Sequence, residues 1–585
     1  NEFSNEISSA DFLGNDEVAE SETSRRDFLK FMGFSTAAAT LAACEAPIVE
    51  SIPYVVKPDS LTPGLPSYYA TSMFDGMDYA SVLVKTREGR PIKVEPNTDA
   101  HFNGSTNART QASVLSLYDG ARLRNPKVSG EDASWGDALT VAKGMLTAKS
   151  VLLTSSVISP ALKTAIAKLG LRHVSVDAVS SSARLDVYEG FTGKRGLPTI
   201  DLDHAATVFA VGADFLGDWG GQNLMAAYAE RRKPGKGMLR HLQAEAGLSI
   251  SGSNSDVRIK ARVSEYEAIL AHVYNKVVAA LDMSKLSASV SAPTLREDIA
   301  SSVDAAATEL ISAGSGALVL NGLNTENAER LALAINLALG SKALNTSKFV
   351  YTANGNDKAA TALVADVASG SVDTIVALGI NPAYQMPLVD LTGVNVVAIA
   401  DREDETASSA KVALPVSHYL ESWSDFRATD GHYAVGQPTI SPLFDSKSAV
   451  EIVNALAGGS KSAKALIEAS ASANAGSISW NALLHDGYVS VAAAEVSMNG
   501  SMDAGMIDVS GINVMKPQSG LEFYTYTKTG MGAGENANNP WTYELPDPIS
   551  RLSWDNYIVM SAADAVELGI EVAPESNGAM TGNTL

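Results

Sequence analysis

The chain has 585 residues, enough for about four domains, and 45% of them are apolar, as in an ordinary soluble protein. Acidic residues outnumber basic ones by 66 to 44, for a formal charge of −22, so no partnership with nucleic acid is expected. The chain contains 1 cysteine. This excludes an intrachain disulfide, a cysteine-ligated zinc site and an iron–sulfur cluster held by this chain alone.

The first 44 residues have the order of an export signal. An acidic stretch precedes the pair Arg25 and Arg26, and a short apolar run at 31–43 leads to Cys44. That run is too short to span a bilayer, which takes about 20 residues. The Leu-Ala-Ala-Cys run that ends at Cys44 resembles a lipoprotein box. We interpret Arg25 and Arg26 as a twin-arginine export signal and Cys44 as a lipid-attachment site. The alternative is a short amphipathic helix in which Cys44 is a buried apolar residue.

This interpretation places the protein on the periplasmic face of the cytoplasmic membrane. One lipid chain anchors a protein only marginally, so membrane partners are expected as well.

A small β-rich domain is predicted next. Residues 80–86 and 91–94 have strand composition and are joined by a turn at Glu88, Gly89 and Arg90, which predicts a β-hairpin.

From about residue 150, short apolar runs alternate with segments of helical periodicity. This alternation is the pattern of doubly wound parallel sheets, so the predicted class is α/β with two such sheet domains. Strands are predicted at 151–153, 207–212, 317–320, 374–379 and 394–400, and helices at 160–169 and 325–339.

The last part is predicted to be less regular. Residues 456–505, rich in Ala, Ser and Gly, are expected to form a loose connection. Residues 511–526 and 557–560 are expected to be strands of a β-barrel domain, which so few strands cannot close, and we expect the chain to continue beyond Leu585. The predicted domains are 1–44 (leader), 45–149 (small β-rich domain), 150–300 and 301–455 (first and second α/β domains), 456–505 (connection) and 506–585 (start of the barrel).

Residues that carry chemistry are few. No phosphate-binding loop or nucleophile elbow is present, and the glycine-rich stretch at 532–537 is followed by Asn-Asn-Pro-Trp, so it is expected to be a loop. His418, with Glu421 and Asp425 nearby, is expected to be structural, the alternative being an acid–base pair. Glycine turns at 211–214 and 378–382 follow buried strands, where α/β sheets place ligands. Tight packing explains such turns equally well.

In their order, the motifs resemble the molybdopterin-containing oxidoreductase superfamily, over about residues 68–570. Residues 89–97 resemble the hairpin of its first domain. The other matching segments are 117–119, 122–126, 134–139, 212–216, 379–382, 405–407, 414–425, 437–440, 538–541, 544–549 and 554–556.

The departures from that family concern its cofactors. Members commonly hold a [4Fe–4S] cluster with four cysteines of the first domain. Those places fall here on Met73, Gly76, Ala80 and Asn107, none of which supplies a thiolate, so the resemblance implies that the cluster has been lost. The family's metal ligand would fall around 183–186, where Asp186 is the candidate, and we expect no bound metal.

An exported member without these ligands resembles the B subunits of bacterial alternative complex III, which oxidises membrane quinol and passes electrons to a cytochrome or a terminal oxidase. The resemblance implies a cofactor-free structural half of an iron–sulfur subunit, with [4Fe–4S] and [3Fe–4S] clusters in its continuation. The implied partners are a multihaem cytochrome c and integral membrane quinol-binding subunits. Two alternatives are a molybdenum or tungsten enzyme with Asp186 as metal ligand and a free-standing periplasmic ligand-binding lipoprotein.

Overall fold

The computed structural model describes residues 62, 64–221, 224–281, 289–492, 507–554 and 556–570, and the backbone of two short strands beyond them. The predicted leader, with Arg25, Arg26 and Cys44, lies outside the described residues, as do 493–506. Within the described ranges, none of the helices is both long and apolar enough to cross a membrane.

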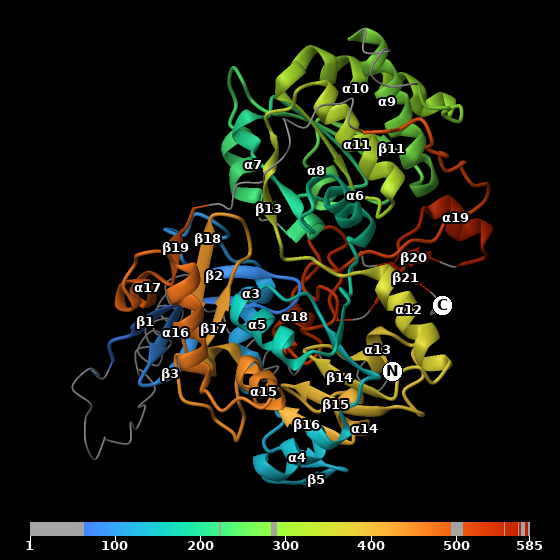
Figure 1. Cartoon of the computed structure of the whole chain (residues 1–585). Helices are drawn as coiled ribbons and strands as arrows, with labels where there is room; N and C mark the ends of the chain where they lie inside the picture. The colour runs from blue at the N-terminus through green and yellow to red at the C-terminus, as the bar shows by residue number, and fades with distance from the viewer. Residues whose placement is uncertain are drawn as a thin grey trace, which may run out of the picture. The chain divides into compact units, whose positions relative to one another are not determined.

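The first described domain is a three-stranded antiparallel sheet in the order β1-β2-β3, drawn in blue in Figure 1. It consists of β1 (Ser67–Phe74), β2 (Tyr79–Arg87) and β3 (Arg90–Pro96). Val82, Val84 and Val94 are fully buried beneath α3 (Ala108–Ser116). The predicted hairpin is confirmed: Glu88 and Gly89 have positive φ angles of 52° and 78°, as a tight hairpin turn requires.

A seven-stranded sheet forms the larger α/β body. Five adjacent strands are parallel and reach one edge of the sheet, and β4 and β5 extend the other edge in antiparallel fashion. Apolar side chains of α4 (Trp135–Met145), α5 (Pro160–Leu169) and α15 (Ala449–Leu456) pack on one face, and those of α12 (Asp357–Ala368) pack on the other. The sheet is therefore doubly wound. Its strand order is β5 (Glu131–Asp132), β4 (Lys127–Val128), β16 (Val412–Pro415), β15 (Asn395–Ala400), β14 (Thr374–Leu378), β6 (Ser150–Thr154) and β7 (Arg172–Ser175).

A second, four-stranded sheet is entirely parallel. Helices α9 (Tyr266–Ala280), α10 (Glu297–Ala313) and α11 (Glu326–Ala338) cover one face, and α7 (Met225–Arg231) lies on the other. Its strand order is β11 (Val257–Lys260), β10 (Arg240–Glu245), β9 (Thr207–Val211) and β12 (Ala317–Asn321). A separate antiparallel pair, β8 (Leu197–Ile200) and β13 (Leu344–Val350), flanks the insertion that carries this sheet, and α6 (Ser182–Thr192) precedes it.

The two parallel sheets do not divide the chain at residue 300, as the sequence had suggested. The seven-stranded sheet takes strands from 127–175 and again from 374–415, while the four-stranded sheet uses 207–321, between them. The second α/β body is therefore an insertion into the first. The five strands predicted for the two α/β domains are all present, but an apolar run does not reveal which strand it pairs with.

Two expectations for the later part of the chain are wrong. Residues 463–490 are not a loose connection, because α16 (Ala463–Asn474) and α17 (Trp480–Asp486) form there, and β19 (Tyr488–Ser490) completes a sheet with β17 (Ser424–Phe426) and β18 (His432–Gly436). Residues 511–526 and 557–560 contain no strand. The remaining short elements are α8 (Ile250–Ser253), α13 (Pro382–Gln385), α14 (Glu405–Ser409), α18 (Pro540–Glu544), α19 (Ala562–Glu567), β20 (Val572–Pro574) and β21 (Met580–Gly582).

Candidate functional site

The glycine turns after the parallel strands differ in what surrounds them. Gly212, after β9, has φ 67°, and a Cβ there would lie 2.3 Å from the ring of Tyr266. A Cβ on Gly322, after β12, would lie 2.0 Å from the carbonyl oxygen of Gly212. These two glycines therefore serve tight packing. Gly379, after β14, has φ 60°, and its nearest neighbour would be Ser155 Oγ at 4.0 Å. Of the two glycine turns at 211–214 and 378–382, the second therefore leaves space beside its glycine for another group.

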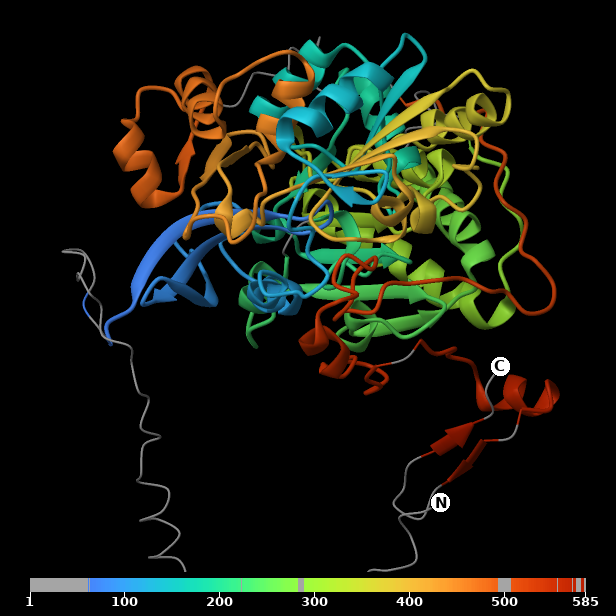
Figure 2. The same cartoon turned by 90° about the horizontal axis from the view of Figure 1, so that it is seen from below.

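Residues 527–540, which we call the crevice segment, belong to the red part of the chain in Figure 2 and contact α3 and the chain that follows β15. The guanidinium of Arg402, after β15, donates to the Glu535 carbonyl oxygen at 3.3 Å. The Asn539 side chain donates to the carbonyl oxygen of Ala112 at 2.7 Å. The chain thus occupies part of the region where an α/β sheet places ligands.

Arg109 connects three parts of the molecule. It lies on α3 and is 3% exposed. Its guanidinium binds both carboxylate oxygens of Asp78, at 2.6 and 2.9 Å, and donates to Asp218 at 2.8 Å and to the Thr529 carbonyl oxygen at 2.7 Å. Thr527 Oγ1 also donates to Asp218, at 2.6 Å. Burial alone would lower the pKa of Arg109, but the hydrogen bonds that it donates to Asp78 and Asp218, and their charges, outweigh this effect. The pKa is therefore raised and the side chain stays charged.

Asp75 adds a second carboxyl group to this region. Its Oδ1 accepts from the backbone N–H groups of Met77 and Asp78, at 3.0 and 2.7 Å. Burial raises the pKa of Asp75 to about 7, and the charges of Asp78 and Glu535 act in the same direction. Burial raises the pKa of Glu535 as well. The proton on Asp75 is therefore partly lost near neutral pH.

Asp75→Asn is expected to make the protein less sensitive to pH. The pKa of Asp75 is raised from 3.8 to about 7 in the folded state, so folding favours the protonated carboxyl. The stability that this proton provides is complete at acidic pH and is lost as pH rises through about 7. Between ~pH 5 and ~pH 8 the free energy of unfolding of the wild type should fall by about 2 kcal/mol, and that of the variant should not show this fall. Urea unfolding of both proteins at the two pH values measures this, and an equal loss in both would contradict it.

The four positions that correspond to lost cluster ligands are all engaged in the chain's own packing. Met73 on β1 and Ala80 on β2 face each other across the ladder and are both buried. A Cβ on Gly76 would lie 3.2 Å from Ser155, and its φ is 100°. Asn107 Oδ1 caps α3 by accepting from the Thr110 N–H at 2.8 Å, and its Nδ2 donates to Asp78 at 3.0 Å.

These residues do not fit a [4Fe–4S] cluster, which needs thiolate ligands. A cavity of about 60 Å³, lined by Asp78, Ala80, Asn107 and Asp218 among others, lies beside them. It has room for a few water molecules.

Asp186, the candidate metal ligand, has both carboxylate oxygens occupied. Oδ1 accepts from Arg195 at 2.6 Å, and Oδ2 pairs with the Lys358 ammonium at 2.7 Å. Burial by itself would raise the pKa of Asp186, but hydrogen bonds and charge from Lys358 and Arg195 lower it. The carboxylate is thus held by two cations, and this donor set does not fit a metal ion. No cluster of three or more His, Cys, Asp or Glu side chains suited to a metal occurs in the described ranges.

His418 is a satisfied structural residue. Its Nε2 lies 2.9 Å from Ser116 Oγ, and its Nδ1 accepts from the Leu420 N–H at 3.3 Å. Burial lowers the pKa of His418 to about 4, and the charge of Arg122 contributes to the shift. Glu421 forms a buried two-point ion pair with Arg122, at 2.6 and 3.2 Å.

Asp425 binds different partners, and no acid–base pair is assembled. It accepts from Ser159, Ser470 and, at 3.0 Å, from Tyr433.

Two donors of the crevice segment have unmet hydrogen-bonding capacity. Lys528 Nζ and Asn536 Nδ2 are buried and have no acceptor within the part of the chain that the structure describes. Water or a small molecule with acceptor atoms would satisfy them.

Sequence reasoning did not find these two donors or the contacts of Arg109, which bring together residues 78, 109, 218 and 529. One signal was available for Arg109: a cation in the first turn of a helix opposes the helix dipole and calls for an acidic partner.

No family model matches the chain. Its sequence is 24% identical, over 613 aligned positions, to a protein of Nitratidesulfovibrio vulgaris strain Hildenborough described as "Menaquinone reductase, molybdopterin-binding-like subunit". The alignment covers 93% of this chain and 88% of that relative. Among solved structures, acetylene hydratase from Pelobacter acetylenicus is similar with a TM-score of 0.54 and 12% identity, over 86% of this chain and 81% of that chain. At that identity the likeness shows the fold alone. The chain therefore has a multi-domain α/β fold with parallel sheets like that of acetylene hydratase, and its sequence is distantly similar to that of a molybdopterin-binding-like subunit.

Proposed function

We propose that this chain is a structural subunit of a membrane-bound, quinone-linked oxidoreductase complex and that it carries no redox cofactor of its own. The observation that carries the proposal is that the positions of the family's cofactor ligands serve internal contacts of this chain. The fold is that of a molybdopterin oxidoreductase-like protein, but Met73, Ala80 and Asn107 are built into its packing and capping, and Asp186 into ion pairs. A scaffold that keeps its fold while its ligand positions serve internal contacts is suited to holding neighbouring subunits.

The similarity to a menaquinone reductase subunit supports the quinone-linked part of this proposal, because it covers 93% of the chain. More specifically, we propose the cofactor-free half of the iron–sulfur subunit of an alternative complex III. In that role the chain docks a multihaem cytochrome c, integral membrane quinol-binding subunits and the cluster-bearing part of its own subunit. Electrons pass through those parts and on to a cytochrome or a terminal oxidase. Export by Arg25 and Arg26 and acylation at Cys44 place the chain on the periplasmic face of the membrane.

Purification through an affinity tag on this chain, from detergent-solubilised membranes, tests the proposal. We expect multihaem and multi-spanning subunits to copurify, together with quinone-linked electron transfer. We also expect molybdenum, tungsten and oxidised pterin to be far below stoichiometric amounts. Stoichiometric molybdenum or pterin would overturn the cofactor-free assignment. Recovery as a monomer, without partners, would overturn the assignment to a complex and favour a ligand-binding lipoprotein.

The variant Asp186→Asn distinguishes two roles for this carboxylate, a structural ion pair and a metal ligand. If Asp186 only pairs with Arg195 and Lys358, the substitution should lower the free energy of unfolding by about 1 kcal/mol. Electron transfer by the purified complex should then stay within about twofold of the wild type. Asp390→Asn, at an exposed aspartate whose side chain contacts Thr392, is the matched control. Loss of electron transfer and of bound metal in the Asp186 variant alone would support the enzyme interpretation.

A further inference from the structure

The tip of the β2–β3 hairpin is basic in a strongly acidic protein. Residues 85–95 contain 4 basic and 2 acidic residues, whereas the whole chain has a net charge of −22. Arg87 and Arg90 are exposed and form no ion pair within the described ranges. Lys93 is 57% exposed, and its ammonium lies 3.4 Å from Glu95. This end of the sheet therefore presents several cations to solvent.

Large apolar side chains are interleaved with these cations. Tyr68 is 50% exposed, Ile92 46% and Leu65 64%. The Lys85 ammonium lies 5.7 Å from the centre of the Tyr68 ring, as in a cation–π contact. We call Leu65, Tyr68, Arg87, Arg90, Ile92 and Lys93 the tip patch. Tyrosine and aliphatic side chains among Lys and Arg match the interface of a bilayer, where rings sit at headgroup depth and cations contact phosphates.

The sheet holds this patch in a fixed shape. Tyr68 and Lys85 are directly opposed in the β1–β2 ladder, and Lys85 is in turn opposed to Lys93 on β3. An irregularity between Lys85 and Thr86 changes the register where Ile92 lies. Because Val84 and Val94 are buried beneath the same strands, the tip is supported from behind. Binding would therefore require little reordering of the backbone.

We propose that the tip patch docks on the headgroups of an anionic lipid bilayer. The inference rests on the membrane attachment assigned under the proposed function, and it adds a second contact to it. One acyl chain holds a protein on a membrane only marginally, and a polybasic surface is the usual second element. Leu65 follows Cys44 by 21 residues in the sequence. An anionic surface repels most of a protein with a charge of −22, so the basic patch also sets the orientation. An acidic protein partner would satisfy the cations but would leave the interleaved apolar side chains without a lipid interface.

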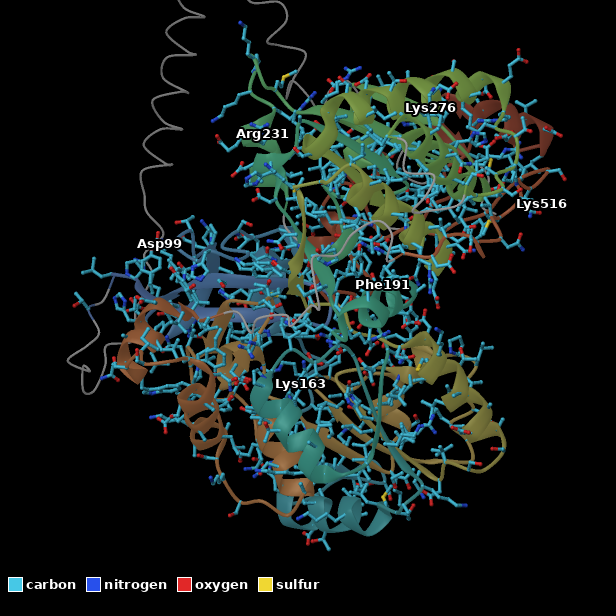
Figure 3. All side chains as sticks on the ribbon, turned by 45° about the horizontal axis from the view of Figure 1, so that its top comes forward. Asp99, Lys163, Phe191, Arg231, Lys276 and Lys516 are labelled. Carbon is cyan, nitrogen blue, oxygen red and sulfur yellow. The ribbon has the colours of Figure 1, made fainter. Side chains whose placement is uncertain are left out.

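Vesicle binding by the full chain tests this inference. Cys44→Ser, placed in every protein used, removes any contribution of the acyl chain. We expect cosedimentation with phosphatidylglycerol-containing vesicles, weak binding to pure phosphatidylcholine vesicles, and release by salt. Arg90→Glu with Lys93→Glu should lower the partition coefficient at least about tenfold, since each basic residue near an anionic surface contributes about fivefold. Lys461→Glu with Lys516→Glu is the control, because both lysines are exposed and neither belongs to the patch. Lys516 lies on the C-terminal segment, far from Asp99 and the blue sheet in Figure 3.

The outcomes separate this inference from the proposed function. Equal binding to neutral and anionic vesicles, or equal loss in patch and control variants, overturns the inference. Loss of copurifying subunits in the patch variant with vesicle binding unchanged also overturns it and identifies the patch as a protein interface. If the tagged native chain copurifies with a quinone-linked complex but does not bind vesicles, only the inference fails. If the chain binds vesicles but has no complex partners, only the proposed function fails. Matching thermal melts of all variants exclude misfolding as the cause.

Discussion

Arg109→Met is expected to lower the free energy of unfolding by about 3–5 kcal/mol, because it removes a buried charge and leaves two largely buried carboxylates without their counter-charge. Asp78 and Asp218, with side chains 15% and 17% exposed, both bind this guanidinium. The loss also releases the Thr529 carbonyl, so the crevice segment should come away from α3 near Thr529, while Asn539 still binds Ala112. Urea unfolding measures the first effect, and proteolysis within 527–540 measures the second.

A smaller change and a surface control make this result interpretable. Arg109→Lys keeps the charge but cannot bind Asp78, Asp218 and the Thr529 carbonyl together, so its loss should be about half as large. Arg330→Met removes an exposed helix pair with Glu326 and should cost less than about 1 kcal/mol. If Arg109→Met were as mild as Arg330→Met, the contacts of Arg109 would not hold these parts of the molecule together.

Local signals predicted the elements well where capping and periodicity agree. The helix expected at 160–169 forms at those residues, with Ser159 as N-cap, proline at its first position and Gly170 at its end. The helix expected at 325–339 begins after Thr325, whose side chain accepts from the Ala328 N–H. In both cases a capping residue adjoins an amphipathic run, and the decisive interactions are close in sequence.

Predictions failed where the structure depends on distant residues or on composition alone. Strand β6 lies between β14 and β7, and its own sequence carries no sign that β14, some 220 residues later, is its neighbour. The Ala- and Ser-rich stretch was expected to be loose because its composition is simple. Alanine favours helix, however, and Ser462 and Ser479 cap α16 and α17.

The candidate site was predictable in part. The glycine turns lie after the strands as expected, but only the surrounding side chains show that Gly212 packs against Tyr266 while Gly379 borders free space. The absence of thiolates follows directly from the sequence. The sequence does not show how the positions of the lost ligands are used. Asn107, for example, caps α3 and also donates to Asp78, and the second contact joins residues 29 positions apart.

Substitutions in the ion pair between Arg122 and Glu421 should show whether this buried pair stabilises the fold or only fixes the positions of the residues around it. Both side chains are at most 1% exposed, and Glu421 also accepts from the His418 and Leu443 N–H groups, at 3.0 and 2.8 Å. Arg122→Met leaves Glu421 charged and unpaired and should cost about 3–5 kcal/mol. Adding Glu421→Gln removes the unpaired charge and keeps an acceptor for one of the two N–H groups, which bond to different oxygens of Glu421. The double variant should therefore recover part of the loss.

The pH dependence of the same variants provides an independent check. Burial alone would raise the pKa of Glu421, but the hydrogen bonds from Arg122 and the Leu443 N–H lower it. A lowered folded-state pKa means that the stability is present above the ordinary value of 4.5 and is lost as pH falls through the folded-state value. The free energy of unfolding of the wild type should therefore fall at acidic pH, and this fall should be absent in the double variant. An identical acid profile in both proteins would mean that Glu421 gains no stability from Arg122, and that the pair is retained for the position it gives His418 and the chain around Leu443.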